Sequence, residues 1–294
     1  MSIRPLYECH GHIMMDGMDF VRAAGKHKQG VDVAAVRENL AIFAETGVVY
    51  FRDGGDSLGV SAYAKKIANE YGIHYATPAF ALYKEGRYGN IVGRAYSSFT
   101  ESLKLIKQAK EAGADYIKLV MSGLMTFDAY GEMSCPPLSA EEIFELVKAC
   151  HGEGFRVMAH VNGRDTIKAA LEAGTDSIEH GYFMDEECID LLIEKESVWV
   201  PTLAPLVAAS ELPGKRGEIA REILMNQRHA VSKAIFKGAH VASGSDSGCG
   251  GVLHGIGILT EYEMLRKLSG LEDEEFFDLV DIANVRIKEN FRVT

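Results

Sequence analysis

The sequence has no long hydrophobic run and no cysteine pattern typical of a disulfide framework. Its apolar stretches fall short of the roughly 18 residues that a membrane span needs, and residues 1–6 do not resemble a signal sequence. The five cysteines are odd in number, widely separated and without Cys-x-x-Cys spacing. We therefore expect a soluble cytoplasmic protein, with no membrane contact, whose thiols stay reduced.

Basic residues are also scarce. The chain has 31 Lys and Arg against 42 Asp and Glu, a formal net charge of -11, and no basic stripe. This balance argues against a nucleic-acid partner and leaves a small-molecule substrate as the expected ligand. The 294 residues, of which 47% are hydrophobic, suffice for a sizeable core, and no composition break suggests a linker. We expect one domain spanning residues 1–294.

Short runs rich in β-branched and aromatic residues recur along the chain and predict eight strands. They cover residues 6–10, 48–52, 75–82, 116–121, 156–160, 177–180, 198–203 and 240–244. Helical patterns separate them, including residues 32–45, with Val33, Val36, Leu40 and Phe43 on one face. A second helix is predicted over residues 139–152, with Ser139 at its start.

Alternating strands and helices predict an α/β protein with a parallel sheet, which right-handed crossovers can close into a (β/α)8 TIM barrel. A doubly wound open sheet is the alternative. No Gly-x-Gly-x-x-Gly turn follows the first strand, which weakens that alternative. Residues 80–100 and 208–221 are predicted to be long connections over one end of the barrel.

Histidine, lysine and aspartate residues stand at or just beyond the ends of several predicted strands. They are His10, His12, Lys118, His160, His180 and Asp246. In a barrel, the chemistry takes place where the carboxyl ends of the strands converge. Side chains at i and i+2 of a strand point the same way, and imidazole is a good ligand for zinc and neighbouring metals. The pattern therefore predicts a metal site.

Each residue alone has a simpler explanation. A lone His-x-His pair is usually solvated, a single strand-end histidine is usually a hydrogen-bonded core residue, and Asp246 could form a turn. Lys118 interrupts an apolar run, where a buried ammonium is costly unless it is paired or neutralised. It either pairs with an acid or is carbamylated by carbon dioxide into an anionic bridge between two metals. The recurrence of such residues at equivalent strand ends favours the metal site.

Taken together, the sequence resembles the amidohydrolase superfamily, in its binuclear class with a carboxylated lysine. That class places His-x-His on strand one, Lys on strand four, His on strands five and six and Asp on strand eight, and the residues of this chain match in that order. Residues 159–163, 176–181, 200–203 and 254–255 are similar to the prolidase and imidazolonepropionase-related branch. Relatives in this branch usually carry a small β-sandwich. Only nine residues precede His10, so we expect no sandwich here.

The resemblance implies two divalent metal ions, with zinc as the default and manganese, cobalt or iron as alternatives. It implies His10, His12 and Asp246 on one metal and His160 and His180 on the other, bridged by a hydroxide and by Lys118 carboxylated with carbon dioxide. Asp246 and Lys118 are then also the catalytic residues, with Asp246 as the proton shuttle.

The expected function is hydrolysis of an amide-type C–N bond in a small molecule such as a dipeptide or an N-acyl amino acid. A lactonase or phosphotriesterase would use the same ligands. A deaminase is disfavoured because deaminases of this superfamily generally lack the bridging lysine. A non-catalytic metal-binding protein that lost its outer domain is the alternative outside enzymes, and the intact Asp246 weighs against it.

Five residues are candidate substrate contacts. Arg52 could clamp a carboxylate, or instead pair with the adjacent Asp53. The others lie in predicted loops or just after a ligand: they are Tyr83, Tyr130, Tyr182 and His254. Barrels of this sort often form homo-oligomers, but no apolar stripe in the sequence marks an interface.

Overall fold

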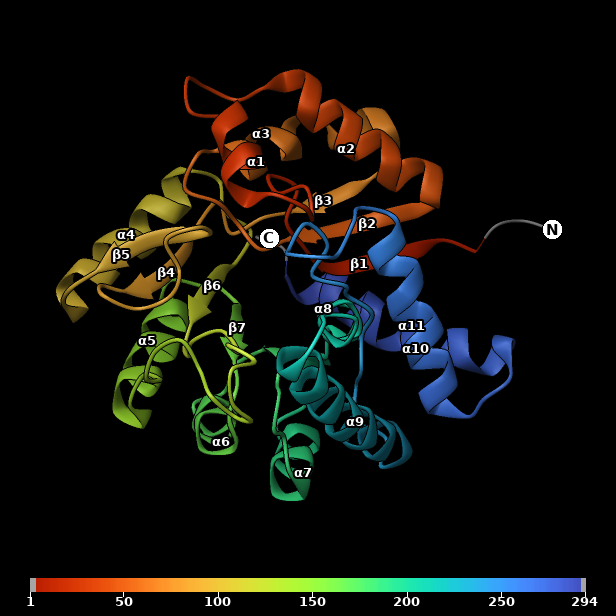
Figure 1. Cartoon of the computed structure of the whole chain (residues 1–294). Helices are drawn as coiled ribbons and strands as arrows, with labels where there is room; N and C mark the ends of the chain where they lie inside the picture. Colours follow the sequence, from red (N-terminus) through yellow and green to blue (C-terminus); the bar gives the residue numbers. More distant parts are fainter. Residues whose placement is uncertain (1–3, 292–294) are drawn as a thin grey trace.

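The computed structural model describes residues 4–291, in which parallel strands are surrounded by helices (Figure 1). One sheet has the strand order β1-β2-β3, and the other has the order β5-β4-β6-β7-β8-β9. The strands are β1 (Leu6–Gly11), β2 (Val48–Asp53), β3 (His74–Ala76), β4 (Ala81–Lys84), β5 (Gly93–Tyr96), β6 (Ile117–Val120), β7 (Val157–Val161), β8 (Ser177–His180) and β9 (Val198–Val200). Every pairing between these strands is parallel, which confirms the α/β class.

The helices of the described part surround the strands in Figure 1, except that the helix at residues 203–210 lies over the middle of the assembly. They are α1 (Phe20–Lys26), α2 (Val33–Thr46), α3 (Val60–Ile67), α4 (Phe99–Glu111), α5 (Ala140–Gly152), α6 (Arg164–Glu172), α7 (Glu186–Glu194), α8 (Leu203–Ser210), α9 (Lys215–Phe236), α10 (Ile256–Ser269) and α11 (Asp273–Asn290). A 3-10 turn, Ala68–Tyr71, follows α3. None of the helices in the described part is long and apolar enough to cross a membrane.

The helices predicted over residues 32–45 and 139–152 are confirmed as α2 and α5. The Asp32 side chain accepts hydrogen bonds from the backbone at the start of α2, and Ser139 forms a capping box with Glu142 at the start of α5. The predicted apolar face of α2 is buried except at Val33, which is 38% exposed because it lies in the first turn.

The predicted strand over residues 75–82 is wrong in extent. It is divided into β3 and β4, and the backbone between them turns at Ala79, whose φ is 60°. The predicted loop over residues 80–100 contains β4 and β5, and residues 208–221 lie mostly in α8 and α9 rather than in a loop. The β4–β5 contact needs a glycine at position 93, because a Cβ there would lie 2.0 Å from the Ala81 carbonyl oxygen.

The last predicted strand, residues 240–244, is irregular, yet its backbone joins the two sheets. Trp199 N donates to His240 O at 2.9 Å on the β9 side, and Cys9 N donates to Ser243 O at 2.9 Å on the β1 side. A further bond links the chain after β3 to the chain before β6, where Asp115 N donates to Thr77 O at 2.8 Å. Closure into the predicted TIM barrel requires hydrogen bonds of this type between the two sheets. A single domain over residues 1–294 without a β-sandwich stays a prediction, and residues 1–3 and 292–294 lie outside the described part.

One end of the strand assembly is filled with apolar side chains. Tyr50, Tyr116 and Met158 from the strand region pack there against Ile287 and Phe291 at the end of α11. Because all strands run parallel, their carboxyl ends lie at the opposite end, where the cavity described next is found.

Candidate metal centre

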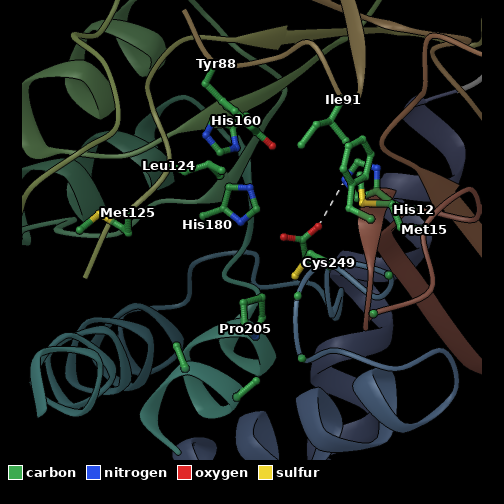
Figure 2. Close-up of a pocket in the computed structure, with 18 of the residues that line it drawn as sticks. His12, Met15, Tyr88, Ile91, Leu124, Met125, His160, His180, Pro205 and Cys249 are labelled. Atoms are coloured by element: carbon green, nitrogen blue, oxygen red, sulfur yellow. Dashed lines mark ion pairs between the residues drawn. The ribbon is translucent and has the colours of Figure 1, made fainter. Parts of the chain in front are cut away.

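All six predicted metal ligands lie together at the carboxyl ends of the strands. The Lys118 Nζ atom on β6 is 3.3 Å from His10 Nε2 and 3.5 Å from His12 Nε2, both from β1 and its end. Asp246 Oδ1 is 3.5 Å and 3.3 Å from the same two nitrogens. The His160 and His180 rings are 4.6 Å apart, and the His10 and His180 rings are 5.0 Å apart. Figure 2 shows His160 and His180 on one side of the cavity and His12 on the other.

Two of the imidazoles are oriented by hydrogen bonds from behind. His10 Nδ1 lies 2.6 Å from Glu179 Oε2, and His180 Nδ1 lies 2.7 Å from Thr202 Oγ1. Each contact leaves the Nε2 atom turned toward the centre. Support of a ligand histidine through its other ring nitrogen is the arrangement that metal sites use to fix tautomer and orientation.

Unusual backbone conformations bring two of the ligands into place. On β8, Ser177 and Glu179 point to the same face, so simple alternation would turn the His180 side chain the other way. His180 instead has φ 64°, and Asp246 has φ 54°, a left-handed conformation that non-glycine residues rarely adopt. Such strain, held by surrounding structure, is common at functional sites.

Burial favours the neutral form of three of the predicted ligand histidines. It lowers the pKa of His10 and of His160 well below the usual range and that of His180 to about 3. Burial also lowers the pKa of Lys118. For Asp246, burial alone would raise the pKa, but the neighbouring histidines, His10 first, hold it far below the usual range. The centre thus combines neutral imidazoles with an ionised carboxylate, which are the forms that bind cations.

The donor set fits divalent metal ions. Within the described residues, His12 Nδ1 and Asp246 Oδ1 are buried and have no hydrogen-bond partner, which is costly for buried polar atoms. Ligand atoms of His10, His180 and Asp246 all lie within 4.8 Å of one another. A cation between these three residues would give Asp246 Oδ1 a partner.

Arg52 does not lie where a substrate clamp would. It is fully buried beneath the centre, where Nε donates to Cys9 O at 2.6 Å, Nη1 to Ser177 Oγ at 2.9 Å and Nη2 to Glu179 Oε1 at 2.7 Å. The predicted carboxylate clamp is therefore wrong, because these chain atoms already occupy the guanidinium. The alternative pairing with Asp53 is also wrong, since the acid that Arg52 contacts is Glu179.

The other predicted substrate contacts divide into one that lines the cavity and three that do not. Tyr182 lines it. Tyr83 is half-buried and packs beside Gly89. Tyr130 is exposed and accepts a hydrogen bond from Asn226. His254 is buried, and its Nε2 atom lies 3.2 Å from His12 O. His254 thus contacts the backbone of His12, a predicted metal ligand, and does not face the cavity.

Two buried glutamates that organise the centre were not among the predicted site residues. Glu179 contacts both His10 and Arg52. Glu8 accepts hydrogen bonds from Ser245 N and Ser245 Oγ, at 2.7 and 2.5 Å, and so holds the loop that carries Asp246. The alternation of side chains along a strand could have indicated these roles. Glu8 lies two residues before His10, and Ser177 lies two residues before Glu179, so each pair shares one face of its strand.

The centre forms the floor of a cavity of about 510 Å³. His12, Lys118, His160, His180 and Asp246 line its floor. Its walls come from the chain after β1, the connections after β4, β6 and β8, α8 with the turn after it, and the glycine-rich loop at residues 248–251. This volume suits a small-molecule ligand.

Sequence comparison matches known proteins to part of the chain. An ochratoxinase of Aspergillus niger is 33% identical over 145 residues, covering 47% of this chain and 30% of that protein. An uncharacterized protein of Mycobacterium tuberculosis is 30% identical over 120 residues, covering 38% and 32%. The alignments thus span about a third of the length of these curated relatives.

Solved structures match the fold over nearly the whole chain. A Xaa-Pro dipeptidase with bound methionine superposes with a TM-score of 0.75 at 21% identity, over 97% of this chain and 76% of that one. A putative prolidase from Bifidobacterium longum gives 0.76 at 20% identity, over 96% and 69%. The A. niger ochratoxinase gives 0.76 at 21% identity, over 96% and 71%.

A family model decides the wider relationship. The model of the amidohydrolase family matches residues 8–285, which include every predicted metal ligand. The match confirms the resemblance drawn from the sequence, and the structural neighbours agree with its prolidase-related branch. This chain belongs to the amidohydrolase family.

Proposed function

We propose that this protein is a metal-dependent hydrolase that cleaves an amide-type C–N bond in a small molecule. The observation that carries the proposal is the convergence of four histidines, a lysine and an aspartate at one centre. All of them except the buried His10 line the cavity floor, and the buried Asp246 Oδ1 atom lacks a hydrogen-bond partner among the described residues. Family membership and the amide-cleaving names of the dipeptidase and prolidase neighbours support it.

The family resemblance assigns these residues to two metal positions. His10, His12 and Asp246 would hold one ion, and His160 with His180 the other, with Lys118 between them. When bound, such ions polarise a scissile carbonyl and make a water molecule acidic enough to act as a nucleophile. Zinc is the first candidate, since imidazole and carboxylate ligands suit it.

Asp246 is the proposed proton shuttle. Its carboxylate lies on the cavity floor and is ionised, so it can accept the proton of the attacking water. The same carboxyl group then donates that proton to the leaving nitrogen as the C–N bond breaks. The amine product leaves neutral, and Asp246 returns to its starting state.

Lys118 is proposed to act as a carboxylated bridge. Its lowered pKa increases the share of neutral amine, which is the form that attacks carbon dioxide. Nζ forms a bond to the carbon and loses one proton, and the product is a carbamate anion. That anion removes the cost of a buried ammonium and offers oxygen atoms to both metal positions.

The test is metal content per chain in protein purified without chelators and with bicarbonate, beside Lys118→Ala and the exposed control Lys104→Ala. We expect about two ions in the parent and the control and fewer in Lys118→Ala, with partial rescue by small carboxylic acids. Equal content in all three would refute the bridge.

Activity is then measured on dipeptides, N-acyl amino acids, lactones and phosphotriesters. Cleavage of amides above the other classes supports the proposal. Faster cleavage of lactones or phosphotriesters would make this a lactonase or phosphotriesterase on the same centre. Bound metal without any turnover would favour a non-catalytic metal-binding protein.

A further inference from the structure

We propose that the substrate is an uncharged amide with a bulky apolar group, and that the cavity discriminates against a free carboxylate. This inference rests on the proposed amide hydrolysis and narrows it. Dipeptides and N-acyl amino acids carry a carboxylate at neutral pH, so the inference separates these from neutral amides with the same scissile bond.

Apolar side chains form the upper walls of the cavity and its mouth. Met15, Ile91, Met125, Phe127 and Pro205 line it above the metal centre. Figure 2 shows Leu124 and Met125 beside the histidine pair, with Tyr88 and Ile91 across from Pro205.

Four further apolar residues that line the cavity are partly exposed to solvent. Met18 is 69% exposed, Phe20 37%, Leu124 40% and Leu212 43%, and all four line the same cavity. Clustered exposed apolar side chains are unusual on a soluble surface and often mark a binding site. A long apolar group that reaches from the centre to the mouth would cover them.

Cations that could bind a carboxylate are missing from these walls. Among the described residues that line the cavity, Lys118 is the one lysine or arginine, and it belongs to the metal centre. A carboxylate moved from water to such walls would lose its hydration without gaining a partner, which is unfavourable.

Arginines that neighbour the lining residues in the chain already have partners. Arg22 pairs with Asp16 at 2.7 Å, Arg87 donates to Pro136 O at 2.9 Å, and Arg216 pairs with Asp128 at 2.8 Å.

The glycine-rich loop of the cavity is also committed within the chain. Gly248 N donates to Val252 O, Cys249 N to Asp246 O and Gly251 N to Gly17 O, at 2.8, 3.1 and 2.8 Å. These amides therefore cannot serve as an anion nest without breaking those bonds.

The remaining polar groups are neutral. Tyr88 and Asn162 line the cavity near the histidines. Asn162 Oδ1 accepts from Tyr182 N at 3.0 Å, and the Asn162 side chain also carries an NH2 donor by valence. Hydroxyl and amide donors suit the carbonyl oxygen of an amide. They do not neutralise a negative charge.

The experiment compares a matched pair of ligands, N-(4-phenylbutanoyl)-phenylalanine and its carboxamide, which differ in one ionised group. Binding is measured by calorimetry to the Asp246→Asn variant, in which proton transfer is blocked, once its metal content per chain is shown to equal that of the parent, and hydrolysis is measured with the parent protein. We expect the carboxamide to bind at least about tenfold more tightly, and its acetyl analogue to bind at least about tenfold more weakly than the phenylbutanoyl compound.

Two variants place a cation on opposite segments of the wall, Leu124→Arg and Leu212→Arg, and Phe144→Arg adds the same charge on the exposed outer face of α5. At least one of the wall variants should narrow the preference for the carboxamide severalfold. Phe144→Arg should leave it unchanged, which separates a local effect from the change in net charge.

The binding measurement tests this inference, and the hydrolysis measurement tests the proposed function. Equal or tighter binding of the acid, or no binding of either ligand, would overturn this inference. Selective binding of the carboxamide with no hydrolysis by the parent would overturn the proposed function and leave the inference standing. Selective binding with hydrolysis supports both.

Discussion

At the scale of single residues, the position of His12 depends on a glycine in the next strand connection. A Cβ at Gly54 would lie 2.0 Å from His12 Cε1 and 2.5 Å from its Nε2. His12 Nε2 is the atom that faces Asp246 and Lys118. The absence of a side chain at position 54 therefore fixes where the His12 ring can lie.

We expect Gly54→Ala to displace the His12 ring, lower metal content per chain and reduce turnover by about a hundredfold, since shifts of about 1 Å have effects of that size. Metal analysis and kinetics test this. Gly152→Ala is the matched control, because a Cβ at that helical position meets no atom within 4 Å. Full metal content in Gly54→Ala would show that His12 is not required as a ligand.

Arg52 makes a second prediction at this scale. Replacing it with Met leaves Glu179 buried without its cation, so the free energy of unfolding should fall by about 3–5 kcal/mol. Denaturant unfolding measures the change, and the exposed Arg37→Met, which removes a surface pair with Glu70, should leave the midpoint nearly unchanged. A raised KM with unaltered stability would restore the role of substrate clamp.

At the scale of elements, α8 begins without a side-chain cap of its own and relies on α10. The Thr202 side chain does not cap the helix and instead contacts His180, while Glu261 of α10 accepts a hydrogen bond from Ala204 N at 2.9 Å. Because α8 also carries Pro205 in the cavity wall, this contact links α10 to the shape of the site.

Burial raises the pKa of Glu261 to about 8. The folded protein therefore binds this proton more tightly than the unfolded chain, and stability should fall as pH rises from about 4.5 toward 8. Glu261→Gln keeps an acceptor for Ala204 N and cannot ionise. It should be more stable than the parent by roughly 3 kcal/mol at pH 7, with the difference vanishing near pH 4.

Unfolding curves of both proteins between pH 4 and pH 8.5 test the role of Glu261. The exposed Glu263→Gln, whose side chain pairs with Lys267 on the same helix, controls for loss of a charge. A constant difference between the parent and Glu261→Gln across this range would mean that the carboxyl does not titrate there.

At the scale of the whole molecule, Asn284 of α11 fastens the irregular segment to the first strand. Its Oδ1 accepts from Ser243 N at 2.9 Å and Ser243 Oγ at 3.0 Å, and its Nδ2 donates to Tyr262 at 3.1 Å. Ser243 O in turn accepts from Cys9 N. The last helix thereby supports the contact between the two sheets.

We expect Asn284→Ala to lower the free energy of unfolding by about 1–3 kcal/mol, because it leaves Ser243 N buried without its acceptor. Thermal and denaturant unfolding measure the loss. Asn226→Ala removes an exposed side-chain bond to Tyr130 and should have little effect. Equal effects would mean that the segment is held by its other contacts.

Several expected properties of the whole molecule stay predictions. They are the homo-oligomer, the absence of nucleic-acid and membrane partners, and the cytoplasmic location.

The sequence by itself determined the alternation of strands and helices, the cap of α5, and the identity of the candidate ligands. These features depend on local periodicity and on residue type at strand ends, both of which are readable along the chain. Tertiary structure alone decided the partner of Arg52, the roles of Glu8 and Glu179, and the apolar, cation-poor walls of the cavity. Those depend on which side chains meet across distant strands and loops, and no spacing along the chain specifies that.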